Sequence, residues 1–126
     1  MRVFRTKPFT RFANHEGITD TELCDAIRRV EKGLLDADLG GGVIKLRLAR
    51  AGRGKSGGLR SIVLFRHGEK AFFVYGFAKS TQDNIKRDEL LVFRKLAVSM
   101  LALNDKALAA AIRNGTITEL DYDQEI

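Results

Sequence analysis

The chain has 126 residues, a net charge of +6 and 44% hydrophobic residues, which predict a single folded domain over residues 1–126. No apolar run approaches the ~18 residues of a membrane helix, and the first residues lack the apolar region of a signal peptide. One cysteine, Cys24, excludes an internal disulfide, and two histidines with one cysteine exclude an ordinary zinc site. We therefore expect a cytoplasmic protein that needs no metal and no cofactor.

The first third of the chain predicts one short strand and two helices. Residues 2–6 favour a strand, and Pro8 suits the first turn of a helix that Gly17 ends. Thr19 and Glu22 have the spacing of a capping box, in which a hydroxyl and a carboxylate accept from the free N–H groups of a helix start. The apolar residues of the second helix share one side: Leu23, Ala26, Ile27, Val30 and Leu34.

The middle of the chain predicts three consecutive antiparallel strands, at about 43–49, 59–66 and 70–78. Each is a run of β-branched, aliphatic or aromatic residues of strand length. The stretch at 39–42 (LGGG) is expected to lead flexibly into the first strand, and 50–58 (RAGRGKSGG) to connect the first two strands. These strands form the centre of the predicted domain.

Positive charge is concentrated on this predicted sheet. The stretch 45–79 contains a single acid, Glu69, against nine basic residues, so the rest of the chain is slightly acidic. The basic residues are Lys45, Arg47, Arg50, Arg53, Lys55, Arg60, Arg66, Lys70 and Lys79. Charge segregated in this way creates a local positive field and predicts a polyanion as the ligand.

Alternation along a strand shows which of these side chains share a face. Lys45 and Arg47 lie two residues apart and point to one face of their strand, and Tyr75, Phe77 and Lys79 share a face of theirs. Whether the two sets lie on the same face of the sheet depends on the strand register, which the sequence leaves open.

The last third predicts two helices and a tail. Asp88 is expected to cap a helix that runs to about Leu103, and Asn104 to cap a shorter one through Ile112. The tail, 115–126, is acidic and is expected to be mobile; its acids are Glu119, Asp121, Asp123 and Glu125. The complete order, β-α-α-β-β-β-α-α, predicts an α+β domain whose antiparallel sheet carries all its helices on one face.

This order and four sequence blocks resemble the RelE/ParE superfamily of toxins from type II toxin–antitoxin systems, and within it the RelE-type, HigB-like branch. The blocks are DADLGGGVIK at 36–45, IKLRLARAGRGKSGGLR at 44–60, FFVYGFAKS at 72–80 and DELLVFRKLA at 88–97. The resemblance implies a toxin that stops translation by cutting messenger RNA, often in the ribosomal A site. It also implies that the RNA's own 2′-hydroxyl attacks the neighbouring phosphate, so that the protein supplies no nucleophile and no metal.

The resemblance also implies which residues act. The basic pair of the first central strand falls on Lys45 and Arg47, the phosphate-contacting arginine on Arg60, and the basic residue that closes the last strand on Lys79. Some members have an arginine next, where this chain has Ser80, and a tyrosine in the following helix, where this chain has none. Contacts with RNA outside this set are expected from Arg50, Arg53, Lys55, Tyr75 and Phe77.

Three other functions fit the same residues. A ParE-type toxin would bind DNA gyrase, a nucleic-acid-binding module would hold RNA without cutting it, and a degenerate member of the family would have lost its activity. For the toxin, the expected partners are messenger RNA, the ribosome and a cognate antitoxin, a small helix-turn-helix protein with acidic residues that lie against the 45–79 region. No membrane partner is expected.

Overall fold

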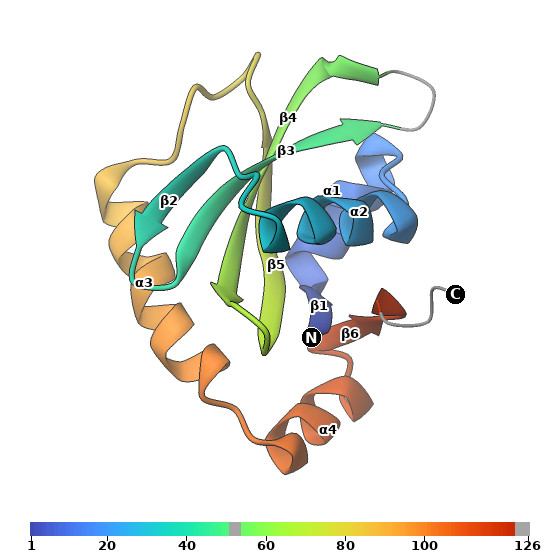
Figure 1. Cartoon of the computed structure of the whole chain (residues 1–126), viewed down its shortest axis with the longest axis vertical. Coiled ribbons are helices and arrows are strands. Elements are labelled where there is room, and N and C mark those ends of the chain that lie inside the picture. Colours follow the sequence, from blue (N-terminus) through green and yellow to red (C-terminus); the bar gives the residue numbers. More distant parts are fainter. Residues whose placement is uncertain (51–53, 123–126) are drawn as a thin grey trace.

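The computed structural model describes residues 1–50 and 54–122, with side chains described outside 50–57 (Figure 1). Within these residues the elements, in chain order, are β1 (Arg2–Thr6), α1 (Lys7–Glu16), α2 (Asp20–Glu31), β2 (Ala37–Gly40), β3 (Val43–Arg50), β4 (Gly54–Arg66), β5 (Lys70–Ala78), α3 (Arg87–Leu101), α4 (Asp105–Arg113) and β6 (Ile117–Leu120).

The strands form one six-stranded sheet in the order β2-β3-β4-β5-β1-β6. The three central strands, β3 to β5, are the antiparallel strands that the sequence predicts, and the α+β class is confirmed. The predicted connection 50–58 is too long, because β3 runs to Arg50 and β4 begins at Gly54. The sheet is mixed rather than antiparallel, because β1 pairs parallel to β5 with Arg2 opposite Lys70. Val3 and Phe4 are both completely buried, so β1 is apolar on both faces and belongs inside the sheet rather than at its edge.

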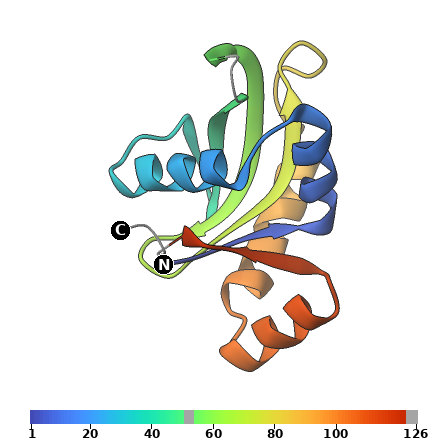
Figure 2. The ribbon, with the colours of Figure 1, turned by 90° about the vertical axis from the view of Figure 1, so that its right-hand side faces the viewer.

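Helices cover both faces of the sheet, which corrects the expectation that they share one face (Figure 1, Figure 2). α1 and α2 pack on one face and α3 and α4 on the other. The central strands explain the arrangement, because neighbouring residues are buried in opposite directions: Val63 lies in the core under α1 and α2, and Leu64 lies in the core against α3 and α4. A sheet that is apolar on both faces needs cover on both.

Local signals placed most helix ends correctly. The Thr19–Glu22 capping box is present at α2, and the Asn104 side chain accepts from Ala107 N at α4. α3 begins earlier than predicted, at Arg87, and Asp88 is not its cap; the Glu89 side chain accepts instead from Lys86 N at 2.7 Å. The N–H group of the N-cap residue, Lys86, is therefore satisfied by a carboxylate at the third residue of the helix.

Glycine is required at two places in the fold, one of close packing and one of a turn. A Cβ on Gly76 would lie 2.1 Å from Cδ2 of Phe12, so only glycine lets α1 lie directly on β5. Gly40 ends β2, and Gly41 and Gly42 connect it to β3; all three have positive φ, and the predicted flexible lead is thus a hairpin turn.

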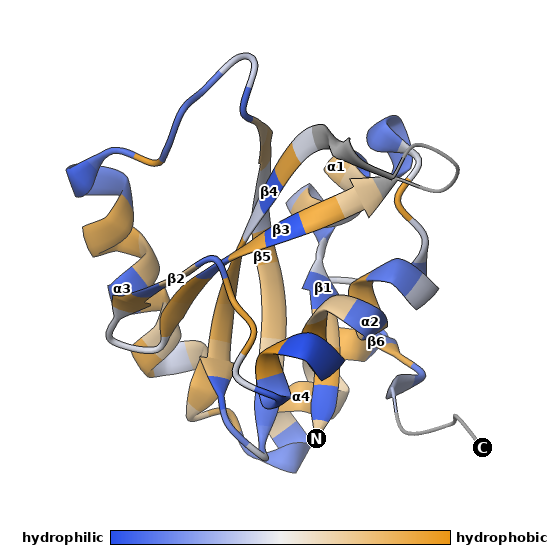
Figure 3. Cartoon of the chain, turned by 45° about the horizontal axis from the view of Figure 1, so that its top comes forward, coloured by the Kyte–Doolittle hydropathy of each residue, from blue (hydrophilic) through white to orange (hydrophobic). Residues whose placement is uncertain are grey.

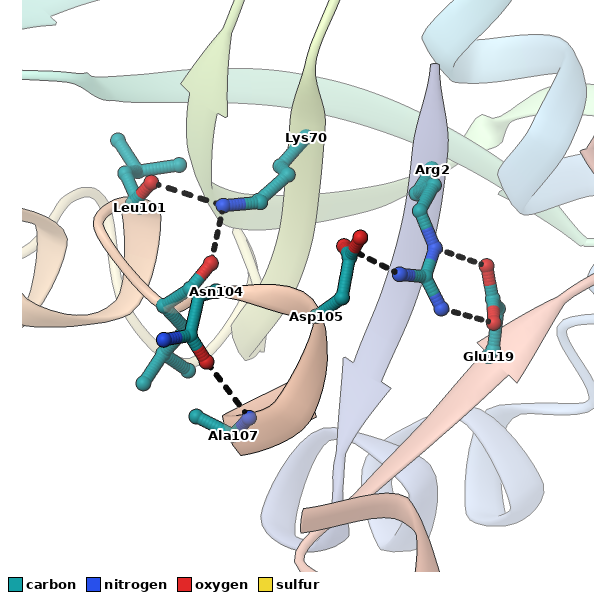
Figure 4. Close-up of polar contacts among 8 residues, drawn as sticks. Arg2, Lys70, Leu101, Asn104, Asp105, Ala107 and Glu119 are labelled. Atoms are coloured by element: carbon teal, nitrogen blue, oxygen red, sulfur yellow. Dashed lines mark hydrogen bonds and ion pairs between the residues drawn. The ribbon is translucent and has the colours of Figure 1, made fainter. Parts of the chain in front are cut away.

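The acidic tail is docked as far as residue 122, although the sequence predicts a mobile end. β6 pairs antiparallel with β1, and Leu120 and Tyr122 are buried. Arg28 Nη2 donates to Tyr122 O at 3.3 Å, which holds the segment against α2. Glu119 binds Arg2, so this carboxylate is already paired (Figure 4). None of the described helices has the length and apolar character to cross a membrane.

Candidate phosphate-binding site

Strand register brings the predicted basic residues onto one face of the sheet. Arg47 lies directly opposite Arg60 in the β3–β4 pair, and Arg60 lies opposite Phe77 in the β4–β5 pair. Residues that face each other across antiparallel strands point to the same side. Lys45, Arg47, Arg60, Tyr75 and Phe77 therefore share the face that carries α3, which answers the question that alternation alone left open.

A β-bulge in β5 is responsible for this common face. Val63 pairs with Phe73 while its neighbour Ile62 pairs with Tyr75, so Val74 is an extra residue on β5. An extra residue reverses the alternation beyond it. Phe73 packs with α1 and α2, yet Tyr75 and Phe77 lie with α3 on the other face. Without the bulge, Tyr75 would point away from the basic residues.

Arg60 is the most enclosed of these cations, with 8% of the residue exposed. Its Nε lies 3.3 Å from Asp36 Oδ2, and its Nη1 donates to the carbonyl of Leu59 at 3.2 Å. Within the described part of the chain, Nη2 makes no hydrogen bond. A guanidinium held on two sides presents its remaining N–H groups in a fixed direction.

Asp36 is an acidic residue at this site that the sequence interpretation missed. The same oxygen, Oδ2, also lies 3.7 Å from Lys45 Nζ, and Asp36 N donates to Lys45 O at 3.0 Å. One carboxylate therefore contacts two cations from two different strands. The sequence signal was the 36–45 block itself, because a hairpin closed by the 40–42 glycines places residue 36 beside residue 45.

The connection between β5 and α3 lies against the same face. Lys45 Nζ donates to Asn84 Oδ1 at 3.5 Å, and Tyr75 Oη donates to Gln82 Oε1 at 2.9 Å. Gln82 Nε2 donates in turn to Asn84 O at 2.9 Å, so these contacts form one polar network. Neither Gln82 nor Asn84 was predicted, since both belong to a polar loop without a motif.

The other predicted residues take different positions. Arg47 and Lys79 are exposed, and Lys79 N donates to Gly58 O at 2.7 Å, which places Lys79 beside the start of the regular part of β4. Phe77 is only 4% exposed and lies in the core, where its ring centroid is 6.0 Å from that of Tyr75, so it supports Tyr75 rather than offering a free ring for base stacking. The side chains of Arg50 and Lys55, and the whole of Arg53, lie outside the described residues.

A hollow of about 400 Å³ adjoins the site at the edge of the sheet. β2 pairs with β3 only through Val43 to Lys45, so β3 has no neighbour on this side from Leu46 onward among the described strands. The basic face is the side of the sheet that carries Lys45, Arg47, Arg60 and Lys79. Asp36 and Arg47 belong both to the wall of the hollow and to this face. The hollow is lined by Ala26, Arg29, Leu34, Leu35, Asp36, Leu46, Arg47, Leu48 and Ala49.

The chemistry of this face is that of an anion site. Lys45, Arg47, Arg60 and Lys79 outnumber Asp36, the one acid that pairs with them in the described residues. Figure 3 shows hydrophilic bands that cross the otherwise hydrophobic strands β3 and β4. In the described part of the chain, no group of three or more His, Cys, Asp and Glu side chains could hold a metal ion. Arginine and lysine can bind a phosphate directly and stabilise additional negative charge on it.

The fold and this face together define a small α+β protein with a cluster of cations on one face of its sheet. A family model described as the RelE toxin of the RelE/RelB toxin–antitoxin system matches residues 1–120. The chain therefore belongs to the RelE toxin family and is a toxin of a toxin–antitoxin system, which implies a cognate antitoxin as its partner. A search among curated proteins returned no match. The HigB-like branch stays a prediction.

Proposed function

We propose that this toxin stops translation in the cytoplasm by cutting messenger RNA in the ribosomal A site. The observation that supports the proposal best is the position of Arg60. Its guanidinium is enclosed, held by Asp36 and by a backbone carbonyl, and lies in register with exposed Arg47. A solvated cation on a half-buried sheet has no need of such support, whereas a group that must meet one phosphate in a fixed orientation does.

The residues divide the work as follows. Arg60 binds the scissile phosphate and stabilises the charge that develops on it, and Arg47 and Lys79 hold the RNA backbone on either side. Lys45, which shares a carboxylate with Arg60, is proposed to move a proton at the site. Tyr75 contacts a base or sugar. Arg50 at the end of β3, Lys55 near the start of β4 and Arg53, between them in the sequence, also bind RNA. The attacking group is the RNA 2′-hydroxyl, which requires neither a protein nucleophile nor a metal.

The test compares three activities of the purified full chain. Programmed ribosomes with messenger RNA should yield cuts at the A-site codon, with 2′,3′-cyclic phosphate ends. Messenger RNA with a 2′-deoxy nucleotide at that codon should remain intact. Supercoiling by gyrase should be unaffected, because the ParE-type mechanism is the alternative. Inhibition of gyrase without RNA cleavage, or RNA binding without cleavage, would refute the proposal in favour of one of the other functions.

The antitoxin is proposed to be a small helix-turn-helix protein that carries acidic residues. It would place them on the basic face or beside it, because a cationic site is most directly neutralised by opposite charge. The open edge of β3 and the adjoining hollow are available for such a segment.

A further inference from the structure

The Asp36 carboxylate lies between two cations that come from different strands. Its Oδ2 lies between Arg60 Nε, at 3.3 Å, and Lys45 Nζ, at 3.7 Å, and no other carboxylate among the described residues pairs with either cation. An enclosed guanidinium without a counter-ion is costly, and two neighbouring cations repel each other. A negative oxygen at this point removes both costs in the ligand-free protein.

The contacts are also loose. Charge-assisted hydrogen bonds between nitrogen and a carboxylate oxygen are typically about 2.7–2.9 Å long, and both Asp36 contacts are longer. The side chain of Asp36 is 25% exposed, so a ligand from solvent can reach the same oxygen position. The backbone of Asp36 is fixed by its hydrogen bond to Lys45 O, so a rotation of the side chain is sufficient to vacate the position.

We propose that Asp36 is the resident counter-ion of the phosphate site, and that a phosphate group of RNA displaces its carboxylate from Arg60 and Lys45. The proposal rests on the proposed function for the identity of the ligand, but not on cleavage. It gives Asp36 two measurable effects: it stabilises the ligand-free fold, and it weakens RNA binding, because each phosphate must compete with it.

The test compares Asp36→Asn with a matched control, Asp83→Asn. Both variants remove one negative charge, and Asp83 is exposed in the same loop as Gln82 and Asn84 but has no ion pair with a described residue. The probes are inorganic phosphate and a short 2′-O-methyl RNA, which cannot be cut. We expect Asp36→Asn to bind this RNA about tenfold more tightly than the native chain. Asp83→Asn should gain less than about twofold, a gain that salt removes.

Thermal unfolding supplies an independent measurement. In phosphate-free buffer, Asp36→Asn should melt below the native chain, and added phosphate should raise its melting temperature more than that of the native chain. If the variant does not fold without phosphate, refolding in phosphate and in chloride of equal ionic strength decides, since only phosphate should recover folded protein. Asp36→Glu keeps the charge and should bind the RNA no more tightly than the native chain.

Several outcomes would overturn the proposal. The first is an RNA affinity of Asp36→Asn no higher than that of Asp83→Asn. The second is a gain in RNA affinity that persists when Arg60→Gln is added to Asp36→Asn. The third is a recovery of folded Asp36→Asn in phosphate no better than in chloride. Because neither probe is cleaved, the result is separate from the cleavage test. A native chain that binds the RNA but cuts no messenger would refute the proposed function and leave the result for Asp36 intact.

Discussion

Two arginine–carboxylate pairs in this molecule use the same chemistry in opposite ways. At one end of the sheet, Arg2 donates from Nε and Nη2 to the two oxygens of Glu119, each at 2.8 Å (Figure 4). On the basic face, Arg60 contacts Asp36 through one nitrogen at 3.3 Å and shares that carboxylate with Lys45. In the first pair Glu119 occupies Nε and Nη2 of Arg2, and Asp105 Oδ1 lies 3.5 Å from Nη1, so negative charge exceeds positive charge. The second has more positive than negative charge.

The difference shows how a fold separates a structural ion pair from a binding site. In the Arg2–Glu119 pair, the hydrogen bonds raise the pKa of Arg2 and lower that of Glu119, and the pair ties β6 to β1. A guanidinium whose N–H groups already donate to a carboxylate of the same chain has few donors available for a ligand. Among the described residues, Arg60 Nη2 has no hydrogen-bond partner, and the exposed Arg47 lies directly opposite Arg60 on β3. These two groups could therefore bind an anion.

The largest expected effect separates the two arginines directly. Arg60→Ala should lower A-site cleavage by at least ~100-fold, as does the removal of a donor that stabilises developing charge in other enzymes. Arg2→Ala is the matched control and should leave cleavage within about twofold, because its partner lies at the other end of the sheet. Cleavage assays and circular dichroism on both variants provide the measurement. Equal losses of cleavage in two folded variants would refute the distinction between the pairs.

The tail gives the next largest effect, on stability. A solvated tail could be deleted without cost, but Leu120 is 4% exposed and Tyr122 is 8% exposed. Deleting 119–126 should therefore lower the free energy of unfolding by several kcal/mol, since the loss of a single buried large side chain costs about 2–5 kcal/mol. Urea unfolding gives the value. RNA affinity should not rise, because Glu119 is bound to Arg2 and does not screen the basic face.

Much of the fold was accessible from local sequence signals, and little of the site's geometry was. Hydrophobic runs located β3 to β5, and cap residues such as Thr19 and Asn104 fixed helix starts, because these signals act over a few residues. The common face of Lys45 and Tyr75 depends on the bulge at Val74, which has no local signature. Asp36 and Asn84 come close to Lys45 only in the folded chain. That helices cover both faces of the sheet depends on which strands pair with each other, which local signals do not show.

A smaller effect is expected on the affinity of the toxin for its antitoxin. Reversing charge at Arg47 and Arg60 together should weaken the toxin–antitoxin complex by ten- to a hundredfold, provided that acidic antitoxin residues cover the basic face, and should flatten its salt dependence. Reversal at Lys106 and Arg113, two exposed cations on α4, is the matched control and should change little. Isothermal titration at two salt concentrations gives both values. If the double reversal at Arg47 and Arg60 leaves the affinity unchanged, the antitoxin binds elsewhere and inhibits the toxin by sterically blocking its access to the ribosome.

The smallest effect concerns the Arg2–Glu119 pair itself. The pKa of Glu119 is lowered in the folded chain from its ordinary value of 4.5, so the carboxylate stabilises the fold at pH values above 4.5, and this contribution is lost as the pH falls through the lowered value. The side chains of Arg2 and Glu119 are 39% and 34% exposed, so solvent screens the pair and its contribution is about 0.2–1 kcal/mol. Glu119→Gln should be less stable by that amount at pH 7 and equal to the native chain in acid well below 4.5. A difference that is the same at both pH values would mean that packing of the side chain, and not its charge, ties β6 to β1.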